Sequence, residues 1–337
     1  MKKIIFLFIA MLMMTLIAGC GSGDEGSSDN GGDSNEIGVT YTTPETGATH
    51  IGMEKFQELV DEKTGGSVSV ELYPNGQLYE SEREAIEATQ AGNIEMTVLA
   101  SAPVASFNPH FMVLDLPFIF PTHELAYEAL DGELGQTLLD ELPEQGLVGL
   151  AYGETGMRQL SNSEKPIEKP EDLSNMKIRT MENEVHIDTF KEYGANASPF
   201  AFGELYSSLQ QNVYDGMENP LNLIDQMKFY EVQNYLTISN HAYTATVGFM
   251  NEDVFNGMSE EDQESVKEAA QESMEYQREE ARNQDDEGLE TIKENMEINE
   301  LTEEQIKEFK EVAEPIFDQY EDEIGADLID LARSYSE

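Results

Sequence analysis

Residues 176–220 read MKIRTMENEVHIDTFKEYGANASPFAFGELYSSLQQNVYDGMENP and predict two consecutive strand and helix units. The first five residues alternate in polarity, as a short strand does. Asn183 is a common helix N-cap, and Gly194 is suited to the left-handed position that ends a helix. A second helix is predicted from about Gly203, with Asn212 at its left-handed end. This order of elements predicts an α/β fold with parallel sheets.

Two polar residues of this segment are suited to bind an anion. Arg179 lies near the end of the first predicted strand, and ligands of open α/β sheets dock at the carboxyl ends of strands. A guanidinium can hold a carboxylate through two parallel hydrogen bonds. Asn219 precedes Pro220, which favours an extended backbone and so fixes the direction of the amide. From spacing alone, an exposed ion pair is the commoner role for such an arginine, and Asn219 reads as a turn residue.

Short motifs in a fixed order extend from this segment along the chain. They are GMR at 156–158, KPIEKPEDL at 165–173, KIR at 177–179, GAN at 194–196, FGELY at 202–206 and DGMENP at 215–220. Together they resemble the DctP-type substrate-binding proteins of TRAP (tripartite ATP-independent periplasmic) transporters, from roughly Ile37 to the last helix. The resemblance implies a two-lobed α/β fold like that of periplasmic binding proteins. A ligand cleft is expected between the lobes, with C-terminal helices that brace both.

The same resemblance implies roles for five residues of the second lobe. Arg179 matches the arginine that holds the ligand carboxylate, and Asn219 matches an asparagine that donates to the same group. Arg158 and Glu218 match an arginine–glutamate pair beside this contact. His241 matches a histidine that completes the network, although a satisfied structural histidine is the alternative.

Four further residues are candidates for ligand contacts. Phe202 matches an aromatic wall of the cleft, where its ring would cover the carbon skeleton of the ligand; a core residue is the alternative. Thr42, Glu80 and Ser101 are candidates from the first lobe.

The length of the chain predicts two lobes, because 337 residues exceed the roughly 250–300 at which a single core tends to divide. Lobe I is expected to comprise residues 37–155 and about 245–283. Lobe II is expected to comprise residues 156–244 and about 284–325, including the bracing helices. Residues 152–156 contain glycines and are suited to a hinge. The charged segment after Ser259 is predicted to be helical to about Gln284.

An internal repeat indicates that the two lobes share one plan. Gln90, Gly92 and Glu95 recur as Gln210, Asn212 and Asp215 at a constant offset. In both places a helix, a left-handed end and an acidic strand follow one another. Coincidence among short polar motifs is the alternative.

The first 36 residues are expected to comprise a targeting signal and a tether. Lys2 and Lys3 precede an apolar run that is too short to span a bilayer, so residues 1–19 are expected to be a cleaved lipoprotein signal peptide. Cys20, the only cysteine, is expected to carry the lipid, with a free thiol as the alternative. Residues 20–36 are rich in Gly, Ser and Asp and are expected to form a flexible acylated tether. The predicted location is extracytoplasmic, with a lipid anchor in the cell membrane.

Charge and motif content limit the function further. The formal net charge of −49 excludes nucleic acid as a partner. The chain has neither a His-Glu-x-x-His motif nor a Gly-x-Ser-x-Gly elbow, and its N-terminal aspartates lack the spacing of a calcium loop. No enzyme activity, metal or cofactor is therefore expected.

These observations predict capture of a small organic acid and its delivery to the membrane subunits of a TRAP transporter. A four-carbon dicarboxylate or a related carboxylate is favoured as the ligand. A module that presents its ligand to a receptor kinase is the alternative, because it would use the same cleft.

Overall fold

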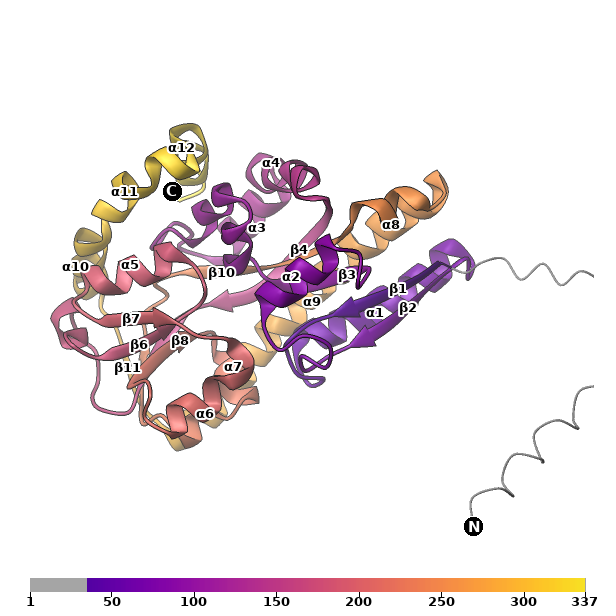
Figure 1. Ribbon diagram of the computed structural model, residues 1–337. Coiled ribbons are helices and arrows are strands. Elements are labelled where there is room, and N and C mark those ends of the chain that lie inside the picture. Colours follow the sequence, from indigo (N-terminus) through magenta and orange to yellow (C-terminus); the bar gives the residue numbers. More distant parts are fainter. Residues whose placement is uncertain (1–34, 337) are drawn as a thin grey trace, which may run out of the picture. The chain divides into compact units, whose positions relative to one another are not determined.

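The computed structural model describes residues 35–336 (Figure 1). The expected signal peptide, the lipid-bearing Cys20 and nearly all of the expected tether lie outside these residues. Within residues 35–336, no helix has both the length and the hydrophobicity that crossing a membrane requires.

Two separate sheets organise the described residues (Figure 1). The first sheet has five strands in the order β2 (Val68–Tyr73), β1 (Asn35–Thr40), β3 (Met96–Ala100), β10 (Tyr243–Asn251) and β4 (Leu147–Met157). The second has six strands in the order β11 (Glu297–Glu300), β9 (Tyr235–Ile238), β5 (Gln159–Asn162), β8 (Gly216–Asn219), β6 (Lys177–Thr180) and β7 (Asn196–Pro199). We refer to the parts built on the first and second sheets as lobe I and lobe II.

Helices cover both sheets, as the alternating pattern predicts. Lobe I carries α1 (Ala48–Thr64), α2 (Glu82–Gln90), α3 (His123–Asp131) and α4 (Glu133–Glu141), with 3-10 turns at η1 (Ala102–Ser106), η2 (Pro109–Asp115) and η3 (Leu142–Gln145). Lobe II carries α5 (Glu184–Glu192), α6 (Leu205–Gln210) and α7 (Leu221–Gln226), with η4 (Pro170–Leu173), η5 (Phe202–Glu204) and η6 (Phe229–Glu231). The remaining helices are α8 (Glu252–Gly257), α9 (Glu260–Asn295), α10 (Glu303–Ala313), α11 (Pro315–Ile324) and α12 (Ala326–Arg333).

Strand pairing follows the predicted pattern of parallel strands joined by helices. In lobe I, β1 pairs in parallel with β2 and β3, and in lobe II, β6 pairs in parallel with β7 and β8. The strands β5 and β10 run antiparallel to their neighbours. On edge strand β2, Val68 and Val70 are buried while Ser69 and Glu71 are exposed, because alternate side chains point to opposite faces.

The helix ends predicted in residues 176–220 are confirmed. The side chain of Asn183 accepts a hydrogen bond from the backbone N–H of Val185 at the start of α5. Gly194 and Asn212 have φ of +86° and +57°, the left-handed values expected beyond a helix. These local signals bring β6 and β8 into adjacent, parallel positions, so Arg179 and Asn219 come from neighbouring strands.

The internal repeat is also confirmed by the backbone. Gly92 has φ of +69°, which matches the left-handed Asn212. The N–H of Asn93 donates to the carbonyl of Ala88 over 2.9 Å, and the N–H of Val213 donates to the carbonyl of Ser208 over 2.9 Å. Each lobe therefore ends a helix with the same hydrogen-bonded turn.

The acidic residue of the repeat has the same structural role in both lobes. Glu95 accepts a hydrogen bond from the backbone N–H of Gly38 on the neighbouring strand β1, over 3.0 Å. Asp215 accepts one from the backbone N–H of Lys177, the first residue of β6, over 2.8 Å. Both carboxylates thus fix the register of the central parallel strands.

Two of the places where the chain crosses between the sheets are adjacent. It passes from β4 to β5 at Arg158 and returns from β9 to β10 through residues 239–242. The backbone N–H of Arg158 donates to the carbonyl of Ala242 over 2.8 Å, and the side-chain oxygen of Gln159 accepts from the N–H groups of Ser239 and Asn240. These hydrogen bonds tie the two crossings together.

The hinge predicted at residues 152–156 is wrong, because these residues belong to β4 and pair with β10. Their glycines allow close packing instead. A Cβ atom on Gly153 would lie 2.3 Å from the side-chain oxygen of Gln277 on α9. The absence of a side chain therefore lets α9 approach the strand, and the crossing follows one residue after β4 ends.

The helix end predicted near Gln284 is also wrong, because α9 continues without interruption to Asn295. Gly288 suggests a helix end by its propensity, but here it permits close packing. A Cβ atom on Gly288 would lie 3.1 Å from Asp225 Cβ and 3.2 Å from the carbonyl of Leu221, both on α7. The helix contacts α1 of lobe I and α7 of lobe II, so the boundary expected near residue 283 falls inside one continuous helix.

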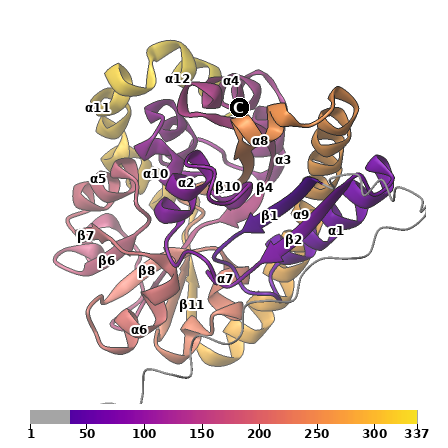
Figure 2. The same cartoon turned by 45° about the vertical axis from the view of Figure 1, so that its right-hand side comes forward.

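The expected bracing by the C-terminal helices is confirmed. Helix α10 contacts α5 and η4 of lobe II, whereas α12 contacts η2 and α4 of lobe I, and α11 contacts elements of both (Figure 2). Ile316, Tyr320 and Ile324 are buried in the same apolar cluster as Leu114 and Leu134 of lobe I. The chain thus has the two-sheet α/β fold that the sequence predicts.

Candidate ligand-binding site

A cavity is lined by residues of both lobes. Lobe I contributes Thr42, Glu82 and Glu154 to its lining, and lobe II contributes Arg179, Phe202 and Asn219. The strands that carry Arg179 and Asn219 end at this cavity, which is where a ligand of an open α/β sheet is expected.

Arg179 is a buried charged group of the cavity lining with few hydrogen bonds. It is 2% exposed, and its Nε donates to the backbone carbonyl of Phe200 over 2.8 Å. Its Nη1 is buried without a hydrogen-bond partner. Burial lowers the pKa of Arg179 to about 10, so the guanidinium stays charged at neutral pH. It therefore presents a buried positive charge with donors available to an anion.

Arg158, at the crossing between the sheets, has by contrast a partner for each of its three nitrogen atoms. Its Nε is ion-paired with the Glu218 carboxylate. Its Nη2 donates to the carbonyl of Glu218 over 2.7 Å and to Oδ1 of Asn219 over 3.2 Å. Its Nη1 donates to Oγ1 of Thr244 over 3.3 Å. Arg158 lines the cavity, but its charge is compensated from within lobe II.

This contact orients the amide of Asn219. Because Oδ1 accepts from Arg158, the NH₂ group is the end that remains. That nitrogen contacts only the sulfur of Met217 at 3.0 Å, and a thioether is a weak acceptor. Asn219 lines the cavity, so its amide can donate to an anion that Arg179 also holds.

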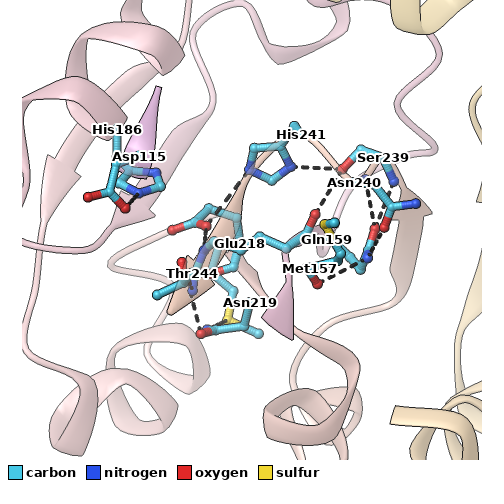
Figure 3. A network of polar contacts seen from close by, with 12 residues as sticks. Asp115, Met157, Gln159, His186, Glu218, Asn219, Ser239, Asn240, His241 and Thr244 are labelled. Atoms are coloured by element: carbon cyan, nitrogen blue, oxygen red, sulfur yellow. Dashed lines mark hydrogen bonds and ion pairs between the residues drawn. The ribbon is translucent and has the colours of Figure 1, made fainter. Parts of the chain in front are cut away.

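Glu218 and His241 lie next to each other (Figure 3), and Glu218 is ion-paired with Arg158. Neither lines the cavity, although both are buried. Burial raises the pKa of the Glu218 carboxyl, but the charge of Arg158 outweighs it and holds that pKa well below its usual range. His241 Nδ1 lies 2.8 Å from the Ser239 hydroxyl, and its Nε2 lies 3.8 Å from the Glu218 carboxylate. Burial lowers the pKa of His241. Glu218 thus holds Arg158 directly, and His241 lies next to Glu218.

Phe202 lines the cavity and also belongs to the core. Its ring meets Phe229 edge to face, with centroids 6.3 Å apart, and it is 8% exposed. The position of Phe202 is therefore compatible with both predicted roles, aromatic wall and core residue.

Of the three candidates from lobe I, Thr42 lines the cavity, whereas Ser101 and Glu80 do not. Ser101 is buried outside the lining, where its backbone N–H donates to the carbonyl of Ala245 over 2.9 Å. Glu80 is exposed and also lies outside the lining, whereas Glu82 is part of it. Ser81 is the N-cap of α2, so Glu82 is the first residue of this helix. The N-cap signal at Ser81 could have pointed to Glu82 instead of Glu80.

Sequence reasoning missed further polar residues of the lining, among them Glu154, Asn222 and Gln226. Asn222 and Gln226 are four residues apart on α7, directly after the motif that contains Asn219. A polar pair with this helical spacing was the available signal. Glu154 lies in β4, and no sequence pattern indicated that it lines the cavity. Within residues 35–336, no group of three or more His, Cys, Asp or Glu side chains is arranged to hold a metal ion.

Asp285 of α9 lies behind Asn222 and is 9% exposed. Its Oδ1 accepts a hydrogen bond from the backbone N–H of Asn222 over 2.8 Å. Burial raises the pKa of Asp285 to about 7. An aspartate of an unfolded chain titrates near about 3.9, so the folded state holds an extra proton between about pH 4 and pH 7. Stability therefore falls as pH rises through this window.

We expect Asp285→Asn to remove this pH dependence, because the amide keeps an acceptor oxygen and cannot ionise. Relative to the parent chain, the variant should have a similar free energy of unfolding at pH 4 and one that is about 1–4 kcal/mol higher at pH 8. Urea unfolding at both pH values measures the difference. An equal difference at pH 4 and pH 8 would contradict the assigned pKa shift.

The sequence profile of the DctP family, described as bacterial extracellular solute-binding protein, family 7, matches residues 39–323. Among known relatives, the C4-dicarboxylate-binding protein DctB of Bacillus subtilis is 35% identical over 281 residues, which are 83% of this chain and 80% of that protein.

Two solved structures share the fold over nearly the whole described part of the chain. The sugar acid binding protein of Advenella mimigardefordensis, in complex with galactonate, has a TM-score of 0.86 and 35% identity over 89% of this chain and 97% of that one. The TRAP periplasmic solute-binding protein of Sulfurospirillum deleyianum, with bound succinate, has a TM-score of 0.85 and 36% identity over 90% of this chain and 99% of that one. The chain therefore belongs to the DctP family, the extracellular solute-binding proteins of TRAP transporters.

Proposed function

We propose that this protein captures a small organic acid outside the cytoplasm and delivers it to the membrane subunits of a TRAP transporter. The observation that carries the proposal is Arg179, a buried guanidinium that lines the cavity with an Nη1 donor lacking a partner. A buried charge without a partner is costly, so its retention is explained by an anionic ligand.

The ligand carboxylate is held from lobe II in this proposal. Arg179 supplies the charge, and the free amide N–H of Asn219 supplies a second donor from the adjacent strand. Arg158 lines the same end of the site and is held in place by Glu218, with His241 behind. Support comes from the relatives with bound galactonate and succinate, since both of these ligands carry carboxylates.

Capture involves closure of lobe I over the bound acid. Thr42 and Glu82 of lobe I line the same cavity as Arg179, so a ligand held by lobe II would touch both lobes. Closure excludes water, which strengthens each charged hydrogen bond. The closed form is then the one that the membrane subunits recognise.

The lipid anchor is a further part of the proposal and rests on the sequence around Cys20. Two acyl chains on this residue would hold the protein at the outer face of the cell membrane. The segment between Cys20 and β1 would then act as the tether.

Uptake by proteoliposomes tests delivery directly. Vesicles that contain the cognate large and small membrane subunits should accumulate a radiolabelled carboxylate only when this protein is added. The variant Arg179→Met should not support uptake, whereas Glu80→Gln, which alters an exposed carboxylate, should. Ligand-dependent binding to a receptor kinase ectodomain without any uptake would instead favour the sensor function.

A further inference from the structure

Among the charged and amide side chains that line the cavity, Arg179 and Asn219 offer donors to a ligand, whereas several others offer acceptor oxygens. We propose that the ligand is a hydroxylated monocarboxylate, whose carboxylate binds Arg179 and whose hydroxyl groups donate to side chains of Glu154, Asn222, Gln226 and Glu82. The inference rests on the proposed function and narrows the class of acid.

In the part of the chain that the structure describes, the lining has four buried oxygens without a hydrogen-bond partner. One is the hydroxyl of Thr43, which can donate as well as accept; the other three can only accept and are Oε1 of Glu154, Oδ1 of Asn222 and Oε1 of Gln226. A buried acceptor without a donor is costly, so such groups normally have partners. All three require O–H or N–H donors, which a carboxylate cannot provide.

The partners of the neighbouring atoms fix which ends are free. Nδ2 of Asn222 donates to the carbonyl of Thr155 over 3.2 Å, and Nε2 of Gln226 donates to the side-chain oxygen of Gln284 over 2.6 Å. Flipping either amide would place two acceptors in contact. The oxygens, and not the NH₂ groups, are therefore the ends that remain for a ligand.

Glu154 is held in the same way. Its Oε2 lies 2.9 Å from Nδ1 of His123 and accepts from the hydroxyl of Tyr127, which leaves Oε1 unpaired. Two side chains thus orient the carboxylate from one side, and its remaining oxygen is the one available to a hydroxyl donor.

The charges of the lining disfavour a second carboxylate on the ligand. Within residues 35–336, Arg158 and Arg179 are the basic residues that line the cavity, and Glu82 and Glu154 are the acidic ones. Arg158 is already paired with Glu218, whereas Arg179 has no ion pair within these residues and only the charge of Glu82 acts on it from lobe I. A dicarboxylate would satisfy Arg179 with one end, but its second charge would share the cavity with two carboxylates and would find no further unpaired cation, which is repulsive.

Glu82, from lobe I, is a further acceptor of the lining. Its only hydrogen bond is a long one of 3.4 Å from the backbone N–H of Ala100. Burial raises the pKa of its carboxyl. Hydroxyl donors would satisfy this group and would also join lobe I to a ligand whose carboxylate is held by lobe II.

Calorimetric titration with acids matched in carbon number tests the inference. The four-carbon set is erythronate, threonate, succinate and butanoate; the six-carbon set is gluconate, galactonate, glucuronate, adipate and hexanoate. We expect at least one hydroxylated monocarboxylate to bind at least about tenfold more tightly than the dicarboxylate and the unsubstituted acid of the same length.

The possible failures are distinguishable. If succinate or adipate binds as tightly as the hydroxylated acids and the binding is lost in Arg179→Met, the hydroxyl assignment is overturned while the proposed function stands. If none of these acids binds, both the proposed function and this inference fail.

Glu82→Gln provides a readout that a general loss of folding would not give. Removing the negative charge should weaken the best hydroxylated acid and tighten the dicarboxylate of equal length, each by about three- to tenfold. The control Glu80→Gln, two residues away and outside the lining, should change neither. Loss of affinity for both ligands in parallel would overturn the role given to Glu82.

Discussion

Replacing Arg179 with methionine is expected to weaken binding of the organic acid by about 30- to 4,000-fold. This range corresponds to about 2–5 kcal/mol, the usual cost of removing one partner of a buried, hydrogen-bonded charge pair. Arg179→Lys should fall between the parent and Arg179→Met, because an ammonium keeps the charge but cannot form two parallel hydrogen bonds. Calorimetry with the tightest acid measures all three dissociation constants.

The stability of Arg179→Met separates a binding role from a structural one. The guanidinium is buried, has no carboxylate partner within residues 35–336 and leaves Nη1 unpaired, so methionine should hold or raise the free energy of unfolding of the ligand-free protein. Arg83→Met is the matched control, since Arg83 is an exposed arginine of α2 paired with Glu87. It should not alter affinity. Weakening of less than tenfold in Arg179→Met would count against the assigned role.

Glu218→Gln is expected to lower the free energy of unfolding by about 3–5 kcal/mol at pH 7, because it leaves the Arg158 charge buried without a carboxylate. Glu218 and Arg158 are 0% and 1% exposed, so water cannot replace the lost partner. The pKa of Glu218 is held below its usual range, so this contribution is present above about pH 4.3 and is lost as pH falls further. Urea unfolding from pH 3 to pH 8 measures it.

The double variant Arg158→Met with Glu218→Gln tests whether the loss comes from the unpaired charge. Removing both charges should restore much of the stability, since a buried ion pair replaced by well-packed neutral groups is often neutral in free energy. If the two substitutions are instead additive, the ion pair is not the source of the effect.

The features that the sequence predicts well are those that depend on neighbouring residues. The cap at Asn183 and the left-handed ends at Gly194 and Asn212 follow from local backbone preferences. The repeat that relates Gly92 to Asn212 was visible because each copy uses the same short turn. Local signals were therefore enough to identify the strand and helix units that carry Arg179 and Asn219.

The errors arise where a glycine serves packing between distant elements. Gly153 and Gly288 suggest a hinge and a helix end by propensity, but each lies opposite a side chain or backbone of an element far away in the sequence. The same limit applies to the site. Arg158, Arg179 and Asn219 were identified through motifs, whereas the unpaired oxygens of Asn222 and Gln226 emerge only when their other hydrogen bonds are known.

The length of α9 restricts how the cavity can open. The helix contacts Gly52 of α1 through Gln277, and it contacts Leu221 and Asp225 of α7 at Gly288. If the two sheets move apart while both contacts persist, α9 must bend, and the whole bend falls on the roughly three helical turns between Gln277 and Gly288. An uninterrupted helix without proline bends only gently, so the opening angle is limited by the elasticity of this single element rather than by the two strand crossings.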